Sequence, residues 1–462
     1  MTNISSTTLG RALSRRRTLI SAAAFVAVVA VACGSDPDSQ QAPAAPADSP
    51  ASGVVTAAPA ATVAPSSTTN PTTPDTGAID SIPGRVLSSV EQTFASRAQG
   101  QGWETDFTKI VDNVDVRDIL SGGVPRDGIP SIDNPKFAAV SDAPAYLRSD
   151  EPVIVLELNG AQRAYPLSIL TWHEIVNDEV NGVPIVVTFC PLCNTSITFP
   201  RTLPDGRVLD FGVSGNLRNS DLIMYDRQTE TWWQQITGEG IIGELAGTKL
   251  EFLPVAITSW DQFATQFPDG DVLLQPTSLD RHPVTGAPIA RNYSSPPYAG
   301  YDSINSSPFL FDGPLDGRLL PMERVATVSL GELEVAYPFN FLAENPVIND
   351  VVDEMPVTVF FDDGTESAFT ARSGNFSKSG STTLFGRTVG DRVLTFSVEN
   401  GVITDAETGS TWSKFGKALD GELAGAELEP VVHAAHFWFA WAAFSPETEI
   451  RDSTDSLTST VV

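Results

Sequence analysis

Two cysteines, Cys190 and Cys193, are the residues of this chain best suited to chemistry. They close an apolar run that begins at Pro184, and the two residues between them bring both sulfurs to one side of a tight turn. Such a pair can hold a metal ion, cycle as a dithiol or close a small disulfide ring. The spacing alone leaves all three interpretations open.

The segments around the pair favour a metal site over a thioredoxin-like dithiol. Thr195 to Phe199 alternates with period two, so the cysteine turn is expected between two strands, whereas thioredoxin-like enzymes place the first cysteine at a helix N-terminus. Two thiolates need a further ligand, and the nearest candidate is His173, on a helix expected to lead into the same strand. Because sulfur with imidazole suits copper or zinc, we expect Cys190, Cys193 and His173 to form a site for one of these metals.

A third cysteine, Cys33, belongs to an N-terminal export signal. Four arginines precede an apolar stretch from Leu19 to Ala32, which is short for a membrane span and ends in a lipobox-like site. Residues 1–33 are therefore interpreted as a lipoprotein signal peptide, with Cys33 as the lipidated first residue of the mature protein. An uncleaved anchor is the alternative, and the export route, Sec or twin-arginine, stays open. This interpretation places the protein on the extracytoplasmic face of the membrane.

Composition divides the rest of the chain. Residues 34–82 are rich in Pro, Ala, Ser and Thr and hold no aromatic residue, Lys or Arg, so we expect a disordered tether. A folded body follows, opening with an N-terminal extension over 83–150. The formal net charge of -29 repels phosphates, which makes nucleic acid a poor partner.

The body carries an internal duplication. Ala164-Tyr165-Pro166 recurs as Ala336-Tyr337-Pro338, and the pentapeptide Gly243 to Gly247 recurs unchanged as Gly421 to Gly425. In this alignment the second copy carries no cysteine, which favours a functional role for the pair. The predicted parts are a first repeat with Cys-Pro-Leu-Cys, a connector, a second repeat and a tail, over 151–270, 271–322, 323–450 and 451–462.

Local patterns predict a mostly β (α+β) fold of two related β-barrel or β-sandwich halves with few short helices. Short β-branched and aromatic runs are separated by Asn-Gly, Asp-Gly and Ser-Gly turns, which are typical of hairpins. In the first repeat the expected strands are 153–158, 185–189, 195–199, 208–213 and 222–225. Helices are expected over 167–177, 260–267 and 436–444.

Other candidate residues have structural interpretations that compete with functional ones. His433 and His436 could share one face of a helix, yet their aromatic surroundings favour a buried wall over metal ligation. Met224 fits the core, with a soft axial ligand as the alternative. The chain has no nucleophile elbow, H-E-x-x-H, Walker loop or dinucleotide fingerprint. Whether the protein is an enzyme therefore stays open.

Several sequence blocks resemble one exported family. The blocks are Gly122 to Asp133, Ala164 to Leu167, His173 to Asp178, Val187 to Asn194, Phe211 to Gly215, Met224 to Arg227 and Trp232 to Gln234. Together they resemble the bacterial and archaeal proteins catalogued as domain of unknown function thirty-one seventy-nine. The resemblance implies an extracytoplasmic setting and marks Cys190, Cys193 and His173 as motif positions.

Two hypotheses of different classes follow. In the first, a lipid-anchored metalloprotein or thiol-redox protein works through the Cys-Pro-Leu-Cys turn. In the second, the body is a non-enzymatic binding or scaffold module whose cysteines form a disulfide. A ligand groove would then come from Trp232, Trp233 and the aromatic connector from Tyr293 to Tyr301. The membrane is the one predicted partner, and no protein partner is predicted.

Overall fold

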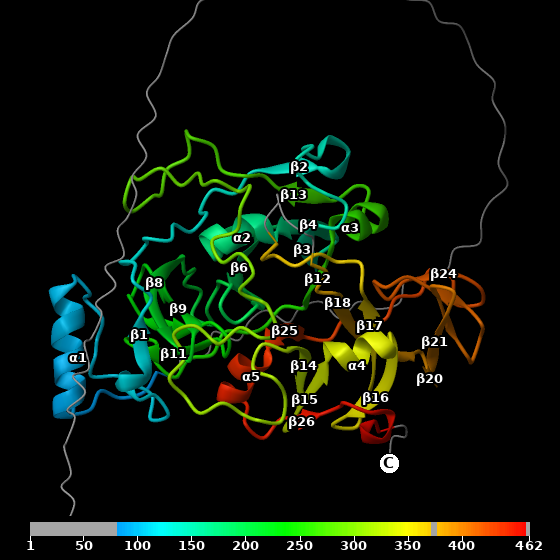
Figure 1. Ribbon diagram of the computed structural model, residues 1–462. Coiled ribbons are helices and arrows are strands. Elements are labelled where there is room, and N and C mark those ends of the chain that lie inside the picture. Colours follow the sequence, from blue (N-terminus) through cyan, green and yellow to red (C-terminus); the bar gives the residue numbers. More distant parts are fainter. Residues whose placement is uncertain (1–80, 371–376, 459–462) are drawn as a thin grey trace, which may run out of the picture. The chain divides into compact units, whose positions relative to one another are not determined.

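The computed structural model of the chain describes residues 81–370 and 377–458 (Figure 1). The predicted signal peptide, Cys33 and the tether up to residue 80 lie outside these residues. Within the described part, no helix is both long enough and apolar enough to cross a membrane.

The first half of the body contains three sheets. One has the strand order β12-β3-β4-β13-β2, with β2 (Phe137–Ala139), β3 (Pro152–Leu158), β4 (Ala161–Pro166), β12 (Val255–Ser259) and β13 (Asp271–Leu273). The next has the order β5-β6-β7, with β5 (Ile175–Val180), β6 (Val183–Cys190) and β7 (Thr195–Pro200). The last has the order β1-β8-β9-β10-β11, with β1 (Ile119–Ser121), β8 (Phe211–Arg218), β9 (Asp221–Asp226), β10 (Trp232–Gln234) and β11 (Glu239–Ile242).

The second half follows with smaller sheets. One has the order β25-β14-β15-β26, with β14 (Arg324–Leu330), β15 (Leu333–Pro338), β25 (His433–Phe437) and β26 (Glu449–Ile450). Another has the order β16-β17-β18, with β16 (Val347–Val352), β17 (Met355–Asp362) and β18 (Ser381–Gly386). The remaining strands are β19 (Thr388–Val389) with β20 (Arg392–Val393), and β21 (Phe396–Glu399), β22 (Val402–Asp405), β23 (Thr411–Trp412) and β24 (Ala418–Asp420).

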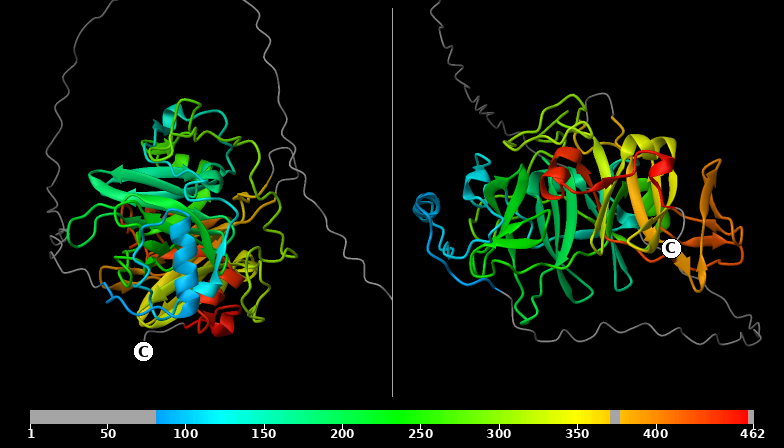
Figure 2. Two further views of the ribbon diagram at one scale, coloured as in Figure 1. Left: turned by 90° about the vertical axis from the view of Figure 1, so that its left-hand side faces the viewer. Right: turned by 90° about the horizontal axis from the view of Figure 1, so that it is seen from below.

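Helices are short and lie between or beside the sheets (Figures 1 and 2). They are α1 (Ser89–Gly100), α2 (Leu167–His173), α3 (Trp260–Gln266), α4 (Phe339–Glu344) and α5 (Trp438–Phe444), with single 3₁₀ turns at Val116–Asp118, Val140–Asp142 and Thr454–Ser456. Each of α2 and α4 follows a proline, which cannot donate to the preceding ladder but suits the start of a helix. The prediction of a mostly β fold with few short helices is confirmed.

The cysteine strand β6 is buried because its sheet is covered on both faces. Its residues from Ile185 to Cys190 are almost fully buried, as expected for a strand whose sequence is a continuous apolar run. Asn181 and Gly182, both with positive φ, form the tight turn that fixes the register of β5 against β6. This register carries Cys190 to the end of the strand, where it pairs with Thr195 of β7.

The same order of elements occurs in both halves, β3-β4-α2-β5-β6-β7 in one and β14-β15-α4-β16-β17-β18 in the other. Equivalent buried hydrogen bonds accompany it: the hydroxyl of Tyr165 donates to Asp178 at 2.7 Å, and that of Tyr337 donates to Asp350 at 2.8 Å. Descent from one duplicated unit stays a prediction. Within residues 81–370 and 377–458 the sheets are open, and none closes into a barrel.

Two expected helices are shorter than the sequence pattern indicated. The helix predicted over 167–177 ends at His173, because Glu174 adopts a left-handed φ of 58° and the β-branched residues after it form β5. The helix predicted over 436–444 begins at Trp438, and His436 lies on strand β25. His433 and His436 therefore do not share one face of a helix, because both lie on β25.

Candidate metal centre

Cys190 ends strand β6, and Cys193 lies on the four-residue connection from Pro191 to Asn194 that leads into β7. The turn is closed by the backbone N–H of Cys193, which donates to the carbonyl of Cys190 at 3.3 Å. Asn194 has a φ of 54°, a conformation that asparagine tolerates better than most residues. Both cysteines are buried and free, with no disulfide between them. The predicted turn between two strands is confirmed.

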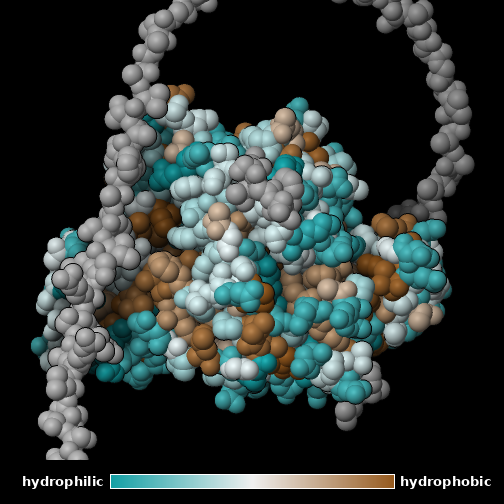
Figure 3. Space-filling view, in the orientation of Figure 1, coloured by the Kyte–Doolittle hydropathy of each residue, from teal (hydrophilic) through white to brown (hydrophobic). Residues whose placement is uncertain are grey.

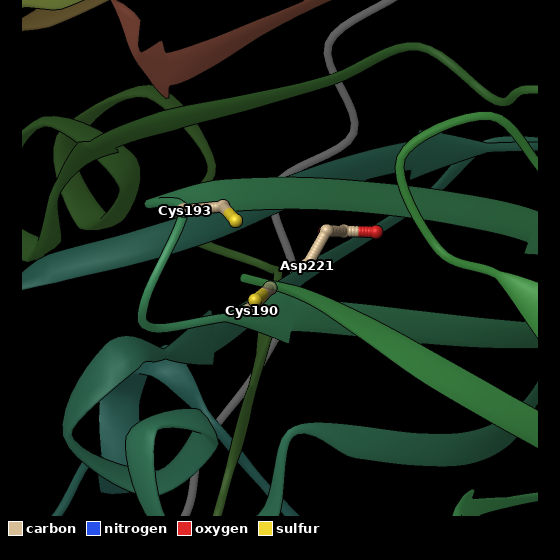
Figure 4. A group of neighbouring side chains, drawn as sticks. All are labelled: Cys190, Cys193 and Asp221. Atoms are coloured by element: carbon tan, nitrogen blue, oxygen red, sulfur yellow. The ribbon is translucent and has the colours of Figure 1, made fainter. Parts of the chain in front are cut away.

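A third residue, Asp221, joins the two cysteines. It opens β9, directly after the two-residue turn of Asn219 and Ser220, both of which have positive φ as in a tight hairpin. The sulfur of Cys190 lies 3.7 Å from the carbonyl oxygen of Ser220, so the hairpin tip touches the cysteine turn. Figure 4 shows the three side chains together, and their candidate ligand atoms all lie within 4.8 Å of one another.

One oxygen of Asp221 is without a partner. Its Oδ2 accepts hydrogen bonds from the side chain of Gln234 at 2.7 Å and from the backbone N–H of Ile236 at 3.0 Å. Its Oδ1 is buried and accepts none from the described part of the chain. An unpaired carboxylate oxygen in a protein interior costs free energy, so a group that binds Oδ1 would stabilise the fold.

The sequence of residues 126–448 matches a family described as "Protein of unknown function (DUF3179)". The chain belongs to this family. No curated protein sequence and no solved structure matches it. The predicted resemblance is thereby confirmed, and the DUF3179 match spans both halves and the connector between them.

In this DUF3179 protein, His173 is not brought to the cysteines as a third ligand. Its buried ring has the Nδ1 atom 2.8 Å from the carbonyl oxygen of Pro130, which only an N–H can satisfy. Its Nε2 then accepts from the hydroxyl of Tyr293 at 2.7 Å. Burial lowers the pKa of His173 to about 4, so the ring is neutral. Both nitrogens are occupied, and the acidic residue that the structure brings to the two cysteines is Asp221.

Burial also governs protonation at the centre. It raises the pKa of the Cys190 thiol, raises that of Cys193 further, and raises the pKa of Asp221 to about 7. The two thiols therefore keep their protons at neutral pH when no cation is present. A metal ion would displace these protons, because thiolate and carboxylate are the ligand forms.

The remaining candidates have structural roles. The Nδ1 atom of His436 lies 2.8 Å from the hydroxyl of Thr195, and its ring stacks on Trp441. His433 is buried with Nδ1 2.8 Å from the carbonyl of Val431. Met224 is fully buried in the core. These placements agree with the predicted buried wall.

Asp221 was missed in the sequence because it is distant from the cysteines along the chain. The available signal was an acidic residue at the first position of an otherwise apolar strand, Leu222 to Tyr225. The equivalent hairpin of the second half, formed by β21 and β22, is shorter, with four residues in each strand against eight and six in β8 and β9. The extra length is what carries Asp221 to the cysteine turn.

Proposed function

We propose that Cys190, Cys193 and Asp221 bind one divalent metal ion and that this centre is the functional site of the protein. The observation that carries the proposal is the buried, unpartnered Oδ1 of Asp221 beside two buried free thiols. In tetrahedral coordination, with metal–sulfur bonds of about 2.3 Å, neighbouring ligand atoms lie roughly 3.5–3.8 Å apart. The ligand atoms therefore need to approach one another by about 1.3 Å at most from their upper bound of 4.8 Å.

Zinc fits this set of ligands better than copper does. Zinc accepts sulfur and carboxylate oxygen together, whereas copper(I) prefers soft sulfur ligands and gains little from a carboxylate. Three protein ligands also leave the fourth tetrahedral position free, which is the arrangement of catalytic rather than structural zinc sites. We therefore narrow the expectation of copper or zinc to zinc.

Thiol redox chemistry is the second candidate function. The observation in its favour is that the sulfurs of Cys190 and Cys193 are free and near each other. Reactive thiols, however, have a lowered pKa, and burial raises the pKa of both of these. The scaffold hypothesis with a structural disulfide draws no support from two free cysteines.

The cellular setting belongs to the same proposal. The arginine-rich start, the short apolar stretch and the lipobox-like site support export and acylation of Cys33. The acidic composition indicates a negatively charged surface, which anionic lipid headgroups repel. The acyl chain on Cys33 would therefore provide the attachment to the membrane. Hydrophilic side chains cover much of the face shown in Figure 3.

Metal analysis of the full chain tests the centre. Protein made in minimal medium and titrated with zinc(II) should bind one equivalent, and cobalt(II) should give the intense absorption of thiolate coordination. Cys190→Ser and Asp221→Asn should each lose the metal, whereas His173→Gln should retain it. Asp362→Asn, at the end of the equivalent strand β17, is the matched control. Retention of metal by Asp221→Asn together with its loss in His173→Gln would overturn this ligand set.

A further inference from the structure

The backbone of Glu174 is in a conformation that glutamate rarely adopts. It ends α2 with a φ of 58° and a ψ of −30°, and the residue is buried. Hydrogen bonds hold it on both sides: its N–H donates to the carbonyl of Leu170 at 2.8 Å, and its carbonyl accepts from Phe189 at 2.8 Å. A residue held in such a sparsely populated φ/ψ region costs about 1–3 kcal/mol.

The fold does not need this strain. In the second half Pro346 occupies the equivalent place, and its carbonyl accepts the same hydrogen bond from Phe361 at 2.9 Å. Proline has a fixed φ near −65°, so an ordinary conformation also forms the connection between helix and strand. The strained backbone at Glu174 therefore serves the position of the side chain, and only the half with the cysteines has it.

Glu174 lines a small cavity that reaches Cys190. The cavity volume is ≈ 60 Å³, enough for a few water molecules. Tyr298 of the connector also lines it, and most of the other walls are aliphatic, including Leu192, Val213 and Leu217. Glu174 itself is buried, with 7% of its surface exposed.

The lining indicates what the cavity can hold. No Lys, Arg or His is among the described residues that form its walls, so an anion would enter without a counter-charge. A divalent ion bound by two thiolates and one carboxylate also leaves the centre with a net charge of about −1, which repels anions further. Burial raises the pKa of Glu174 to about 8, so its carboxyl is mostly protonated at neutral pH and can donate a hydrogen bond.

We propose that this cavity is the substrate site of the centre. It would bind an uncharged molecule of a few non-hydrogen atoms that carries a hydrogen-bond acceptor, with Glu174 orienting the acceptor beside Cys190. The proposal rests on the proposed metal centre. Cys190 borders the cavity, whereas Cys193 and Asp221 do not, so the substrate approaches the centre from the side of Cys190.

Formamide and formate are matched probes, because they have the same number of non-hydrogen atoms and differ in charge. With the cobalt(II)-loaded full chain, formamide should change the visible spectrum saturably, and formate should not. Glu174→Leu should weaken formamide binding about tenfold, equal to about 1.4 kcal/mol, and Glu174→Gln, which keeps a donor, should restore most of it. Leu217→Trp should fill the cavity and abolish the change, while Val398→Trp on β21 should not.

A second measurement needs no metal. In the reduced, metal-free chain, methyl methanethiosulfonate should modify Cys190 at least about tenfold faster than its anionic sulfonatoethyl analogue does, because the apolar cavity disfavours a charge. Leu217→Trp should slow the reaction, and Val398→Trp should not. If cobalt binds but formamide has no effect, the substrate site is wrong and the metal centre still stands. The same holds if Cys190 is modified as fast in the Leu217→Trp protein as in the wild type. Absence of cobalt binding would overturn both.

Discussion

The side-chain amide of Gln234 donates a hydrogen bond of 2.7 Å to Oδ2 of Asp221, and both residues are fully buried. This bond lies between β10 and the start of β9, next to each other in one sheet. The side chain of Gln234 and the backbone N–H of Ile236 both bind Oδ2 of Asp221. Oδ1 is therefore the oxygen that remains available as a ligand atom beside the cysteines. Gln234 is thus a positioning residue for the proposed ligand Asp221.

Gln234→Met should weaken zinc binding about 10–100-fold, the usual effect of losing a group that orients a metal ligand. Methionine keeps the volume of glutamine, so the fold should persist. Competition with a chromophoric chelator measures the affinity, and circular dichroism checks the fold. Gln228→Met, on the exposed surface, is the control. An unchanged affinity in Gln234→Met would mean that Asp221 is not a ligand or needs no orientation.

Glu174→Gly should make the metal-free protein more stable by about 1 kcal/mol, because glycine adopts a positive φ without strain and removes a buried carboxyl. The gain is net of the extra unfolded-state entropy of glycine. Urea unfolding at pH 7 measures it. Pro346→Gly, at the equivalent place in the second half, should lower stability because a proline constraint is lost. Destabilisation by both changes to the same extent would refute stored strain at Glu174.

The stability of the metal-free protein should depend on the protonation of Glu174. Its pKa is about 8 in the folded state against an ordinary value of 4.5, so the folded state binds the proton more tightly. The resulting stability is fully present below pH 4.5 and is lost as pH rises through 8. Between pH 5 and 9 the wild type should lose on the order of 4 kcal/mol more than Glu174→Gln. Urea unfolding with chelator present measures this difference, and parallel pH curves for the two proteins would contradict it.

Cys33→Ser should release the protein from the membrane fraction, because the lipobox interpretation places the acyl chain on this residue. Cell fractionation with a high-salt wash measures the association. Cys190→Ser, which leaves the signal untouched, should remain membrane-bound. If the Cys33→Ser protein stays in the membrane fraction after the wash, the lipoprotein interpretation is wrong.

Local patterns predicted the strands well and the ends of helices less well. The alternation from Thr195 to Phe199 and the apolar run before Cys190 correctly indicated two strands joined by the cysteine turn. The pattern after Leu167 also fits a helix, but α2 stops at His173. Its end depends on the bond from Phe189 to the carbonyl of Glu174, which exists only once β6 lies beside the helix. No local signal reports such a bond.

The sequence by itself determined that the chain is mostly β, that the two body cysteines share one turn, and that the chain resembles the DUF3179 family. These properties follow from periodicity and short spacings, which neighbouring residues impose through backbone geometry. The tertiary structure alone decided which third residue lies beside the two cysteines. His173 is nearer to the cysteines in sequence, but its ring is turned to Pro130 and Tyr293, and the longer β8–β9 hairpin brings Asp221 to the sulfurs instead. Packing between sheets sets such contacts, and packing depends on residues far apart in the chain.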